Sequence, residues 1–433
     1  MLLAFRTANH RSLREPQTLD LRSVYQRDRQ CVNIVALYGA NASGKSNVLD
    51  ALRFMHDAVT SQTRDWRPDE GVPRRPFLLD SEATNEPSSF AVDLLIDDVR
   101  YTYGFSVDDH AVLEEWLFSY PHKKRRTLFE RHGTDYRFGN SLRGTRVPLL
   151  RDITPENMLL LSSVQRIGST ELSKVAGWFR EKLWFADDDN SDDRRVMTRE
   201  LLDGPEKTSR AIELLRVADL GITDVQIHVK GSQNADKAAR FALQLGSSPP
   251  IELEIKSGQE VDVLSNLFAV AAQSMKFTHI GKTGANLSFR DESRGTKTWF
   301  DLVGITVAAL RNGWVLVIDE LDTSLHPLLI RQLVKLFQDR TTNPLGAQLI
   351  FTTHDASLLS RIQGEETLRR DEIWFAEKDS QTGESTIYPL TDFQPREGLN
   401  WEKRYLGGAL GAVPFVTEEA FTHALSDGSD DDA

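Results

Sequence analysis

The sequence predicts a fold of the α/β class, and three features predict it. An apolar run at residues 33–38 leads into a glycine-rich loop, which is followed by apolar residues at helical spacing. Residues 90–138 alternate strand-like runs with turn residues, a pattern typical of an antiparallel β meander. Two later apolar runs, 314–318 and 348–353, end in acidic or imidazole side chains. Buried strands alternating with helices indicate a sheet that helices cover.

The remaining elements follow from local patterns. Residues 1–22 predict two short strands joined by a turn at Glu15-Pro16, and 61–89, rich in Pro, Asp, Arg and Ser, predict a surface excursion. Further along, the patterns predict a buried strand at 158–161, a mostly helical region at 171–220 with an exposed acidic loop at 187–193, strands at 225–229 and 251–255, and a helix at 260–275.

Composition narrows the class of protein. Hydrophobic residues make up 40% of the 433 residues, enough for a sizeable core, and no apolar run approaches the length of a membrane span of about 18 residues. Cys31 is the one cysteine, so the chain cannot form an internal disulfide, and the cytoplasm is the expected compartment. The net charge of −12 argues against general nucleic-acid binding. The basic run 123–126 could form a local basic surface for nucleic acid, but a solvated hairpin loop is favoured.

The glycine-rich loop carries the first chemical signal. Residues 39–46 read Gly-Ala-Asn-Ala-Ser-Gly-Lys-Ser and fit the phosphate-binding pattern between a strand and a helix. Small residues let successive backbone N–H groups close around phosphate oxygens at the helix N-terminus. Lys45 can reach the β- and γ-phosphates, and Ser46 can offer its hydroxyl to Mg²⁺.

The two later apolar runs supply the second half of such a site. Asp319 and Glu320 end the first run, where Asp319 would hold Mg²⁺ and Glu320 would act as general base toward the attacking water. His354 ends the second run, where it could contact the γ-phosphate or that water.

Residues 292–297 indicate another anion site. Ser293 and Gly295 precede a helical pattern, and the N-terminus of a helix favours anions. One chain has no use for two such sites on one phosphate, whereas two chains facing each other could each cap the other's nucleotide.

In this order, the motifs resemble the ATP-binding-cassette type of ATPase head, in the branch of the chromosome-maintenance heads, RecF and the OLD-type ATPases. Three segments, 9–12 (Asn-His-Arg-Ser), 292–296 and 405–408 (Tyr-Leu-Gly-Gly), make the chain similar to single-chain AAA-type ATPase subunits of bacterial anti-phage and abortive-infection systems. The resemblance covers about residues 1–415.

The resemblance implies a role for each matching residue. The triphosphate would be bound by Gly39, Asn41, Ala42, Ser43, Gly44, Lys45, Ser46 and Asn47. Gln165 would link Mg²⁺ to lobe movement, and Asp322 would lie in the loop that crosses a dimer interface. Ser293 and Gly295 would form the signature that contacts the partner's γ-phosphate, and His354 would be the switch histidine.

The expected architecture is a phosphate-loop ATPase head with a mixed core sheet, an antiparallel β subdomain and a helical lobe. The long span from Lys45 to Asp319 contains no heptad repeat, so a globular insertion is expected and a long coiled coil is not. The expected domains are an N-terminal ATPase lobe (1–165), an insertion lobe (166–285), a C-terminal ATPase lobe (286–415) and an acidic tail (416–433).

The expected function is ATP hydrolysis by a homodimer that closes around two ATP molecules with Mg²⁺ and controls a separate effector, such as a nuclease or toxin, in anti-phage defence. No membrane partner is expected. A RecF-like repair ATPase acting on DNA is an alternative, which the acidic charge disfavours. A second alternative is a nucleotide-gated scaffold that binds ATP with little turnover. The presence of the candidate catalytic residues Glu320 and His354 argues against it.

Overall fold

The structure is a computed structural model that describes residues 1–414 and residue 422, except 27, 61–65, 68–69, 143–144, 165–170, 188–189, 204–208, 219–220, 228–239, 244–250, 255–274, 281–285, 363 and 395–398. Contacts divide the chain into two compact units, one of Met1–Leu183 with Ile350–Ala433 and the other of Trp184–Leu349. This division differs from the expected boundaries, because the segment 286–415 is shared between the units. The physical reason is that β16 (Gln348–Thr352) returns the chain to a position beside β3 (Ile34–Tyr38), the strand that precedes the glycine loop.

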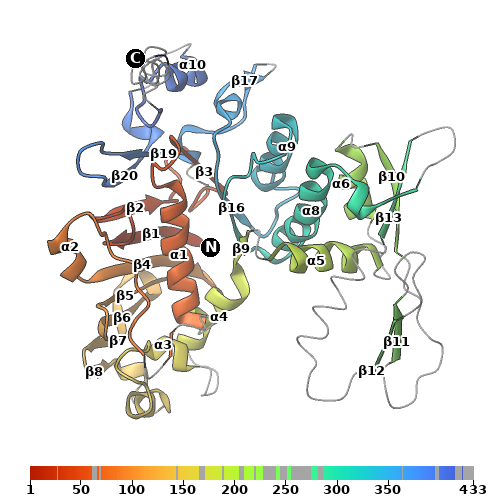
Figure 1. The fold of residues 1–433 in the computed structure, drawn as a ribbon. Helices are drawn as coiled ribbons and strands as arrows, with labels where there is room; N and C mark the ends of the chain where they lie inside the picture. The colour runs from red at the N-terminus through yellow and green to blue at the C-terminus, as the bar shows by residue number, and fades with distance from the viewer. Residues whose placement is uncertain are drawn as a thin grey trace, which may run out of the picture. The chain divides into compact units, whose positions relative to one another are not determined.

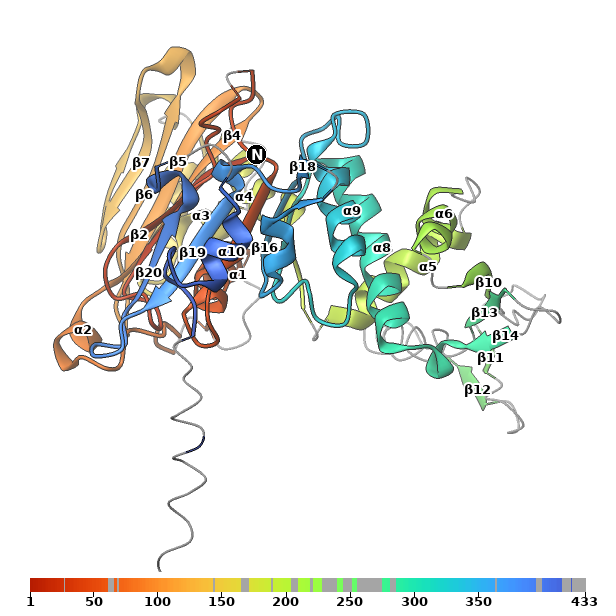
Figure 2. The same cartoon turned by 90° about the horizontal axis from the view of Figure 1, so that it is seen from above.

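The first unit contains a seven-stranded antiparallel sheet in the order β2-β1-β4-β5-β6-β7-β8. Its strands are β1 (Leu2–Ala8), β2 (Gln17–Asp20), β4 (Ser88–Ile96), β5 (Val99–Val107), β6 (Val112–Tyr120), β7 (Arg126–His132) and β8 (Asp135–Phe138). Figure 2 shows β5, β6 and β7 running side by side. The predicted meander and the two predicted N-terminal strands are therefore confirmed.

A second sheet of the same unit positions the glycine loop. β3 (Ile34–Tyr38) is buried along its whole length and lies between β19 (Ile373–Lys378) and β16 (Gln348–Thr352), and β20 (Ser385–Pro389) follows β19. β3 pairs in parallel with β19, and β19 pairs antiparallel with β20, so the sheet is mixed. After β3, the loop enters α1 (Lys45–Thr60), which contacts β1, β4 and α4 (Glu171–Lys182) (Figure 1).

The other helices and strands of this unit are short. They are α2 (Ser81–Asn85), α3 (Leu160–Ser163), α4 (Glu171–Lys182), β17 (Arg361–Ile362), β18 (Glu365–Glu366), α10 (Trp401–Leu406) and several 3₁₀ turns. The predicted strand at 158–161 is wrong, because α3 forms there. The backbone N–H groups of Leu160 and Leu161 donate to the buried carboxylate of Glu115 at 2.7 and 3.0 Å, which caps a helical turn.

The second unit is mainly helical, with α5 (Ser191–Asp203), α6 (Ser209–Val217), α8 (Arg294–Asn312) and α9 (Pro327–Gln338). Its strands are β9 (Leu183–Ala186), β15 (Val315–Ile318), β10 (Ile222–Ile227), β11 (Arg240–Leu243), β12 (Ile251–Glu254), β13 (Met275–His279) and β14 (Asn286–Ser288). β15 lies between β16 and β9, while β10, β13 and β14 form an antiparallel sheet of their own. Figure 1 shows α5 and α8 side by side.

For this unit, one prediction needs correction and two predicted strands are confirmed. The exposed loop predicted at 187–193 ends earlier, because α5 begins at Ser191 with Asp192 and Asp193 in its first turn, where the helix dipole favours carboxylates. The strand predicted at 225–229 is β10 and the one at 251–255 is β12. The helix predicted at 260–275 lies outside the described residues except for Met275, which begins β13, and nearly all of the acidic tail lies outside them too.

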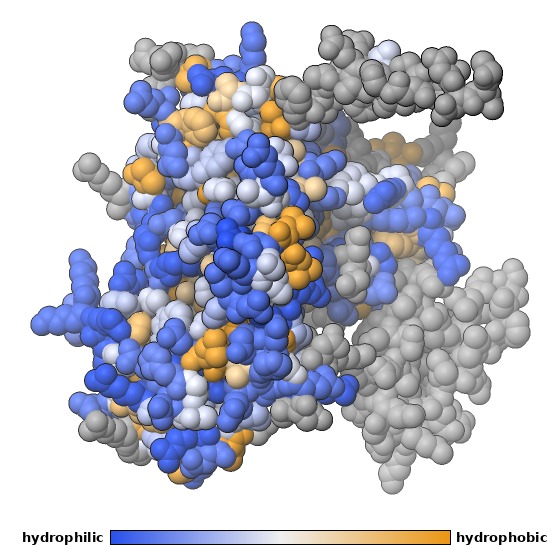
Figure 3. Space-filling model, turned by 60° about the vertical axis from the view of Figure 1, so that its left-hand side comes forward, coloured by the Kyte–Doolittle hydropathy of each residue, from blue (hydrophilic) through white to orange (hydrophobic). Residues whose placement is uncertain are grey.

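The predicted fold class is confirmed: the chain has an α/β fold with a mixed sheet, an antiparallel β-sheet and a helical lobe. Within the described ranges the longest helix is α8 with 19 residues, so they contain no long coiled coil. None of the helices described here has both the length and the apolar character that crossing a membrane requires. On the face drawn in Figure 3, hydrophobic side chains form separate small patches among hydrophilic ones.

Candidate functional site

The loop between β3 and α1 is a narrow cradle that depends on its two glycines. A Cβ atom at Gly39 would lie 2.4 Å from Ser43 Oγ and 2.5 Å from the carbonyl oxygen of Ala376. Gly44 has a φ of 102°, and a Cβ there would lie 2.4 Å from Ser385 Oγ. Only glycine fits both positions, because an added side chain would fill the cradle or strain its backbone.

The polar groups of the loop fit an anionic ligand. Lys45 is buried, and its Nζ donates to the carbonyl oxygens of Gly39 and Ala40 at 2.9 Å each. Ser43 Oγ is buried and has no hydrogen-bond partner within the described part of the chain. Ser46 is exposed in the first turn of α1, and that turn contains no acidic residue, so the positive end of the helix dipole is uncompensated there.

Two serines that the site analysis of the sequence did not select lie against this cradle. The Oγ atoms of Ser12 and Ser385 are hydrogen-bonded at 2.7 Å, and Asn47 Nδ2 donates to Ser12 Oγ at 2.6 Å. The Ser12 carbonyl also accepts from the Ser385 backbone N–H at 2.7 Å. Ser12 belongs to the 9–12 motif, whereas no local signal marks Ser385, because β20 reaches the loop only through the fold.

A charged cluster holds the helix that follows the loop. Asp50 of α1 accepts from His10 Nε2 at 2.7 Å and from Arg11 at 2.5 and 3.0 Å. Burial opposes ionisation of Asp50, but the hydrogen bonds from His10 and Arg11 outweigh it and lower its pKa to about 2. Burial also lowers the pKa of His10, which favours the neutral imidazole with its proton on Nε2.

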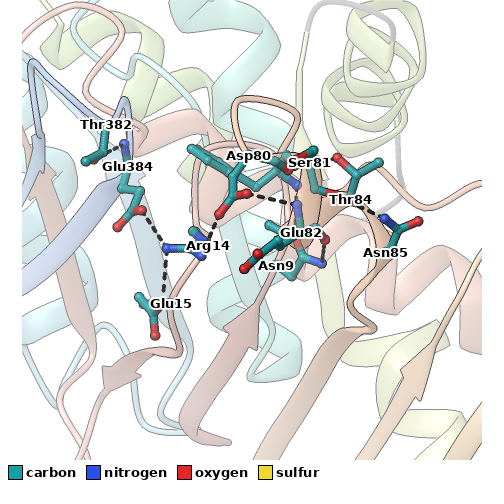
Figure 4. Close-up of polar contacts among 12 residues, drawn as sticks. Asn9, Arg14, Glu15, Asp80, Ser81, Glu82, Thr84, Asn85, Thr382 and Glu384 are labelled. Carbon is teal, nitrogen blue, oxygen red and sulfur yellow. Dashed lines mark hydrogen bonds and ion pairs between the residues drawn. The ribbon is translucent and has the colours of Figure 1, made fainter.

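The segment 9–16 also joins two more distant parts of the first unit (Figure 4). Arg14 forms ion pairs with Asp80, which caps α2, at 2.5 Å and with Glu384, just before β20, at 3.1 Å. Asn9 Nδ2 donates to the carbonyl oxygens of Ala83 and Glu86 at 2.7 and 2.8 Å. This one segment therefore links α2 to the start of β20.

In the second unit, β15 delivers the two predicted carboxylates. Asp319 and Glu320 follow the last buried residue of β15, and both are exposed. Glu320 has a φ of 49°, and Ser324 one of 68°, so two non-glycine residues of the following turn adopt the left-handed conformation. The Thr323 backbone N–H donates to the Glu320 carbonyl at 2.9 Å, and Asp322 lies half-buried within the same turn.

Ser293 and Gly295 lie at the start of α8 in this unit. Ser293 is the N-cap, and its Oγ accepts from the Thr296 backbone N–H at 3.1 Å. A Cβ at Gly295 would lie 2.8 Å from the carbonyl oxygen of Ser324, so the start of α8 touches the turn after Glu320. The first turn of α8 contains no acidic residue.

The other predicted site residues are distributed as follows. His354 is exposed after β16 and belongs to the first unit with the glycine loop, whereas Asp319, Glu320, Asp322, Ser293 and Gly295 belong to the second. Gln165 lies outside the described residues. The described residues contain no group of three or more His, Cys, Asp or Glu side chains arranged to hold a metal ion.

Comparisons with known proteins agree with the class that these motifs indicate. The family model described as "AAA domain, putative AbiEii toxin, Type IV TA system" matches residues 34–360. No curated protein matches the chain.

Solved structures similar to the chain include an SMC head bound to the C-terminal winged-helix domain of ScpA, at 14% identity and a TM-score of 0.42, covering 90% of this chain and 97% of that one. The SMC head domain of Thermotoga maritima has 13% identity and a TM-score of 0.39, with 90% and 98% covered. A Pyrococcus furiosus SMC head has 12% identity and a TM-score of 0.39, with 94% and 98% covered.

Proposed function

Because this chain belongs to the AbiEii-type AAA-domain family, we propose that it binds ATP at residues 39–47 and hydrolyses it with Glu320 as general base. The observation that carries the proposal is the cradle of the first unit. Gly39 and Gly44 leave room in it that a side chain would fill, and Lys45 supplies the cation. Ser43 Oγ is buried there and has no hydrogen-bond partner among the residues that the structure describes. These are the groups that a polyphosphate needs.

Each residue has a defined task in this proposal. The ammonium of Lys45 leaves the carbonyls of Gly39 and Ala40 and donates to the β- and γ-phosphates, while the loop N–H groups bind the remaining phosphate oxygens. Ser46 and Asp319 would hold Mg²⁺, with Gln165 as a further ligand; a magnesium site commonly uses one or two carboxylates together with substrate phosphates. When bound, Mg²⁺ neutralises charge on the phosphates.

Glu320 orients and deprotonates the attacking water, and His354 donates to the γ-phosphate or that water. Both side chains are exposed and follow buried strands, which suits groups that must meet a substrate while their backbone stays fixed.

We further propose that hydrolysis takes place in a homodimer, in which each composite site turns over independently. Ser293 and Gly295 of one chain would complete the cage around the γ-phosphate held by the other, and Asp322 would lie at the interface. The support is the start of α8: an exposed serine N-cap and a first turn without carboxylates suit an incoming phosphate.

The biological role that we propose is control of a separate effector, such as a nuclease or toxin, in anti-phage defence. Closure around ATP and reopening after hydrolysis would give the effector two states to distinguish. The support for a role in defence is the family description, which names a putative toxin of a toxin–antitoxin system; a separate effector is part of the proposal.

Lys45→Ala tests the site assignment. Loss of the phosphate contact should lower ATP turnover by at least about 100-fold, because a charge aimed at the transferred phosphoryl group acts in the transition state. Turnover is measured as phosphate release, and ATP binding by calorimetry.

The matched control is Lys276→Ala, which removes an exposed lysine of β13 and should behave as wild type. Wild-type turnover by a Lys45→Ala protein with unchanged circular dichroism would refute the proposed site.

A further inference from the structure

One polar contact, between a half-buried histidine and a buried glutamate, connects the sheet β10-β13-β14 to the start of α8. His279 is the last residue of β13, and its Nε2 lies 2.6 Å from Glu292 Oε1. The side chains are 20% and 3% exposed, so the carboxylate has almost no contact with water. A carboxylate removed from water is costly unless it is paired, so His279 determines where this side chain can be.

Glu292 immediately precedes Ser293, the N-cap of α8. The chain between β14 and α8 consists of a 3₁₀ turn, Phe289–Asp291, followed by Glu292 and Ser293, and the Glu292 backbone N–H donates to the Phe289 carbonyl at 3.4 Å. Fixing the Glu292 side chain therefore fixes the backbone that leads into Ser293. The pair acts one residue away from the group proposed to contact the partner's nucleotide.

Aromatic packing makes the same connection on the other side of the turn. The rings of Phe277 in β13, Phe289 in the turn and Phe300 in α8 lie with centroids 5.4 to 5.9 Å apart. Lys297 of α8 also donates to the Arg290 carbonyl at 2.7 Å. The sheet and the start of α8 consequently form one packed assembly, and the contact between His279 and Glu292 is a polar link within it.

We propose that His279 is a positioning residue for ATP hydrolysis: by holding Glu292, it orients the Ser293–Gly295 segment toward the nucleotide of the partner chain. A shift of β13 in the sheet β10-β13-β14 would then move the start of α8 and so change its contact with the partner's nucleotide. This inference rests on the proposed dimeric function, and it goes beyond that function by naming the residue pair that sets the trans contact.

His279→Ala leaves the Glu292 carboxylate without its imidazole, so the segment before Ser293 should lose its fixed position. Turnover at saturating ATP should fall about 10- to 100-fold, the loss expected when a reacting group is misplaced by about 1 Å. The KM for ATP should stay within about twofold of wild type, because the residues of the glycine loop are unchanged.

His279→Gln should restore most of the turnover, because the glutamine amide can donate to Glu292 Oε1 from the position of Nε2. Lys276→Ala, on the same strand but exposed, is the matched control and should have wild-type kinetics. Failure of the conservative variant to recover activity, or a loss that appears mainly in KM, would overturn the inference.

Mixed dimers distinguish positioning from a general loss of structure. Mixing His279→Ala with Lys45→Ala chains gives one composite site with an intact loop and an intact signature, so activity should return. Mixing His279→Ala with Ser293→Arg chains places a defect in every composite site, so activity should stay low. A merely destabilised protein would not discriminate between the two partners in this way.

A mixture of Lys45→Ala and Ser293→Arg chains serves as the reference. Suppose that the reference mixture regains activity. If His279→Ala chains then regain activity with Ser293→Arg chains, or fail to regain it with Lys45→Ala chains, the role of His279 is wrong and the dimeric function stands. If the reference itself stays inactive, the trans site is wrong and this inference falls with it.

Discussion

At the scale of single residues, two positions of the glycine loop leave no room for a side chain. Cβ atoms at Gly39 and Gly44 would approach Ser43 Oγ, the Ala376 carbonyl and Ser385 Oγ to 2.4–2.5 Å. The same narrowness lets backbone N–H groups come close to a phosphate. The turn after β15 contains strained backbone, because the non-glycine residues Glu320 and Ser324 both have a positive φ.

Glu320→Gln separates ATP binding from chemistry. The variant keeps the shape of the side chain but removes the base, so turnover should fall by at least about 100-fold while ATP binding is retained. Single-turnover kinetics and equilibrium ATP binding together make the measurement. The exposed Glu82→Gln variant is the control, with wild-type values expected.

If Glu320→Gln weakens ATP binding as much as Lys45→Ala does, Glu320 holds the nucleotide and is not the base.

At the scale of elements, α5 and α8 are locked together. Thr198 Oγ1 of α5 accepts from the Gly304 backbone N–H at 2.9 Å and donates to the Phe300 carbonyl at 2.8 Å. A Cβ at Gly304 would lie 2.4 Å from the backbone nitrogen of Thr198. Arg195 of α5 pairs with both oxygens of Asp301 in α8 at 2.9 and 3.0 Å. The helix that carries Ser293 therefore has a rigid neighbour.

Asp301 should make the stability of this helix pair depend on pH. Burial raises the pKa of Asp301 from its ordinary 3.8 to about 6, despite the ion pair with Arg195. Since the folded protein binds this proton more tightly than the unfolded chain, the stability is fully present below pH 3.8 and is lost as pH rises through 6.

The test compares wild type with Asp301→Asn, which does not titrate. Between pH 4.5 and 7 the wild type should lose about 2 kcal/mol of unfolding free energy relative to the variant. Urea unfolding at both pH values measures the difference, and Asp98→Asn, at an exposed turn, should show none. A constant difference between wild type and Asp301→Asn would contradict the raised pKa.

At the scale of the whole molecule, the proposed catalytic unit is larger than one chain. Turnover per chain should therefore rise with protein concentration while the dimer is forming, and level off once it is complete. Ser293→Arg should block closure through charge and bulk yet bind ATP at the glycine loop almost as wild type does. Turnover at a series of protein concentrations and ATP binding to the variant measure both effects.

Equal mixtures of Lys45→Ala and Ser293→Arg chains complete this test, because random pairing places one intact composite site in about half of the dimers. Activity should recover in proportion to that fraction. Turnover strictly proportional to concentration, with normal hydrolysis by a Ser293→Arg monomer, would exclude the trans site.

Features that depend on local backbone chemistry can be predicted from short stretches of the chain. The loop at 39–46 and the runs that end at Glu320 and His354 are short contiguous patterns, and the meander shows the strand-and-turn alternation of its β-sheet. A glycine pattern followed by a helix has few physical alternatives, so these predictions needed no knowledge of distant residues.

The partners of buried polar groups that are far apart in sequence become visible in the folded chain alone. The apolar run at 158–161 contributes to a helical turn because the carboxylate of Glu115, distant in sequence, accepts its N–H groups. Ser385 reaches the loop at Gly44, and His279 holds Glu292 beside Ser293, for the same reason. A desolvated polar group must find a partner wherever the fold places one, and that partner leaves no mark in the local sequence.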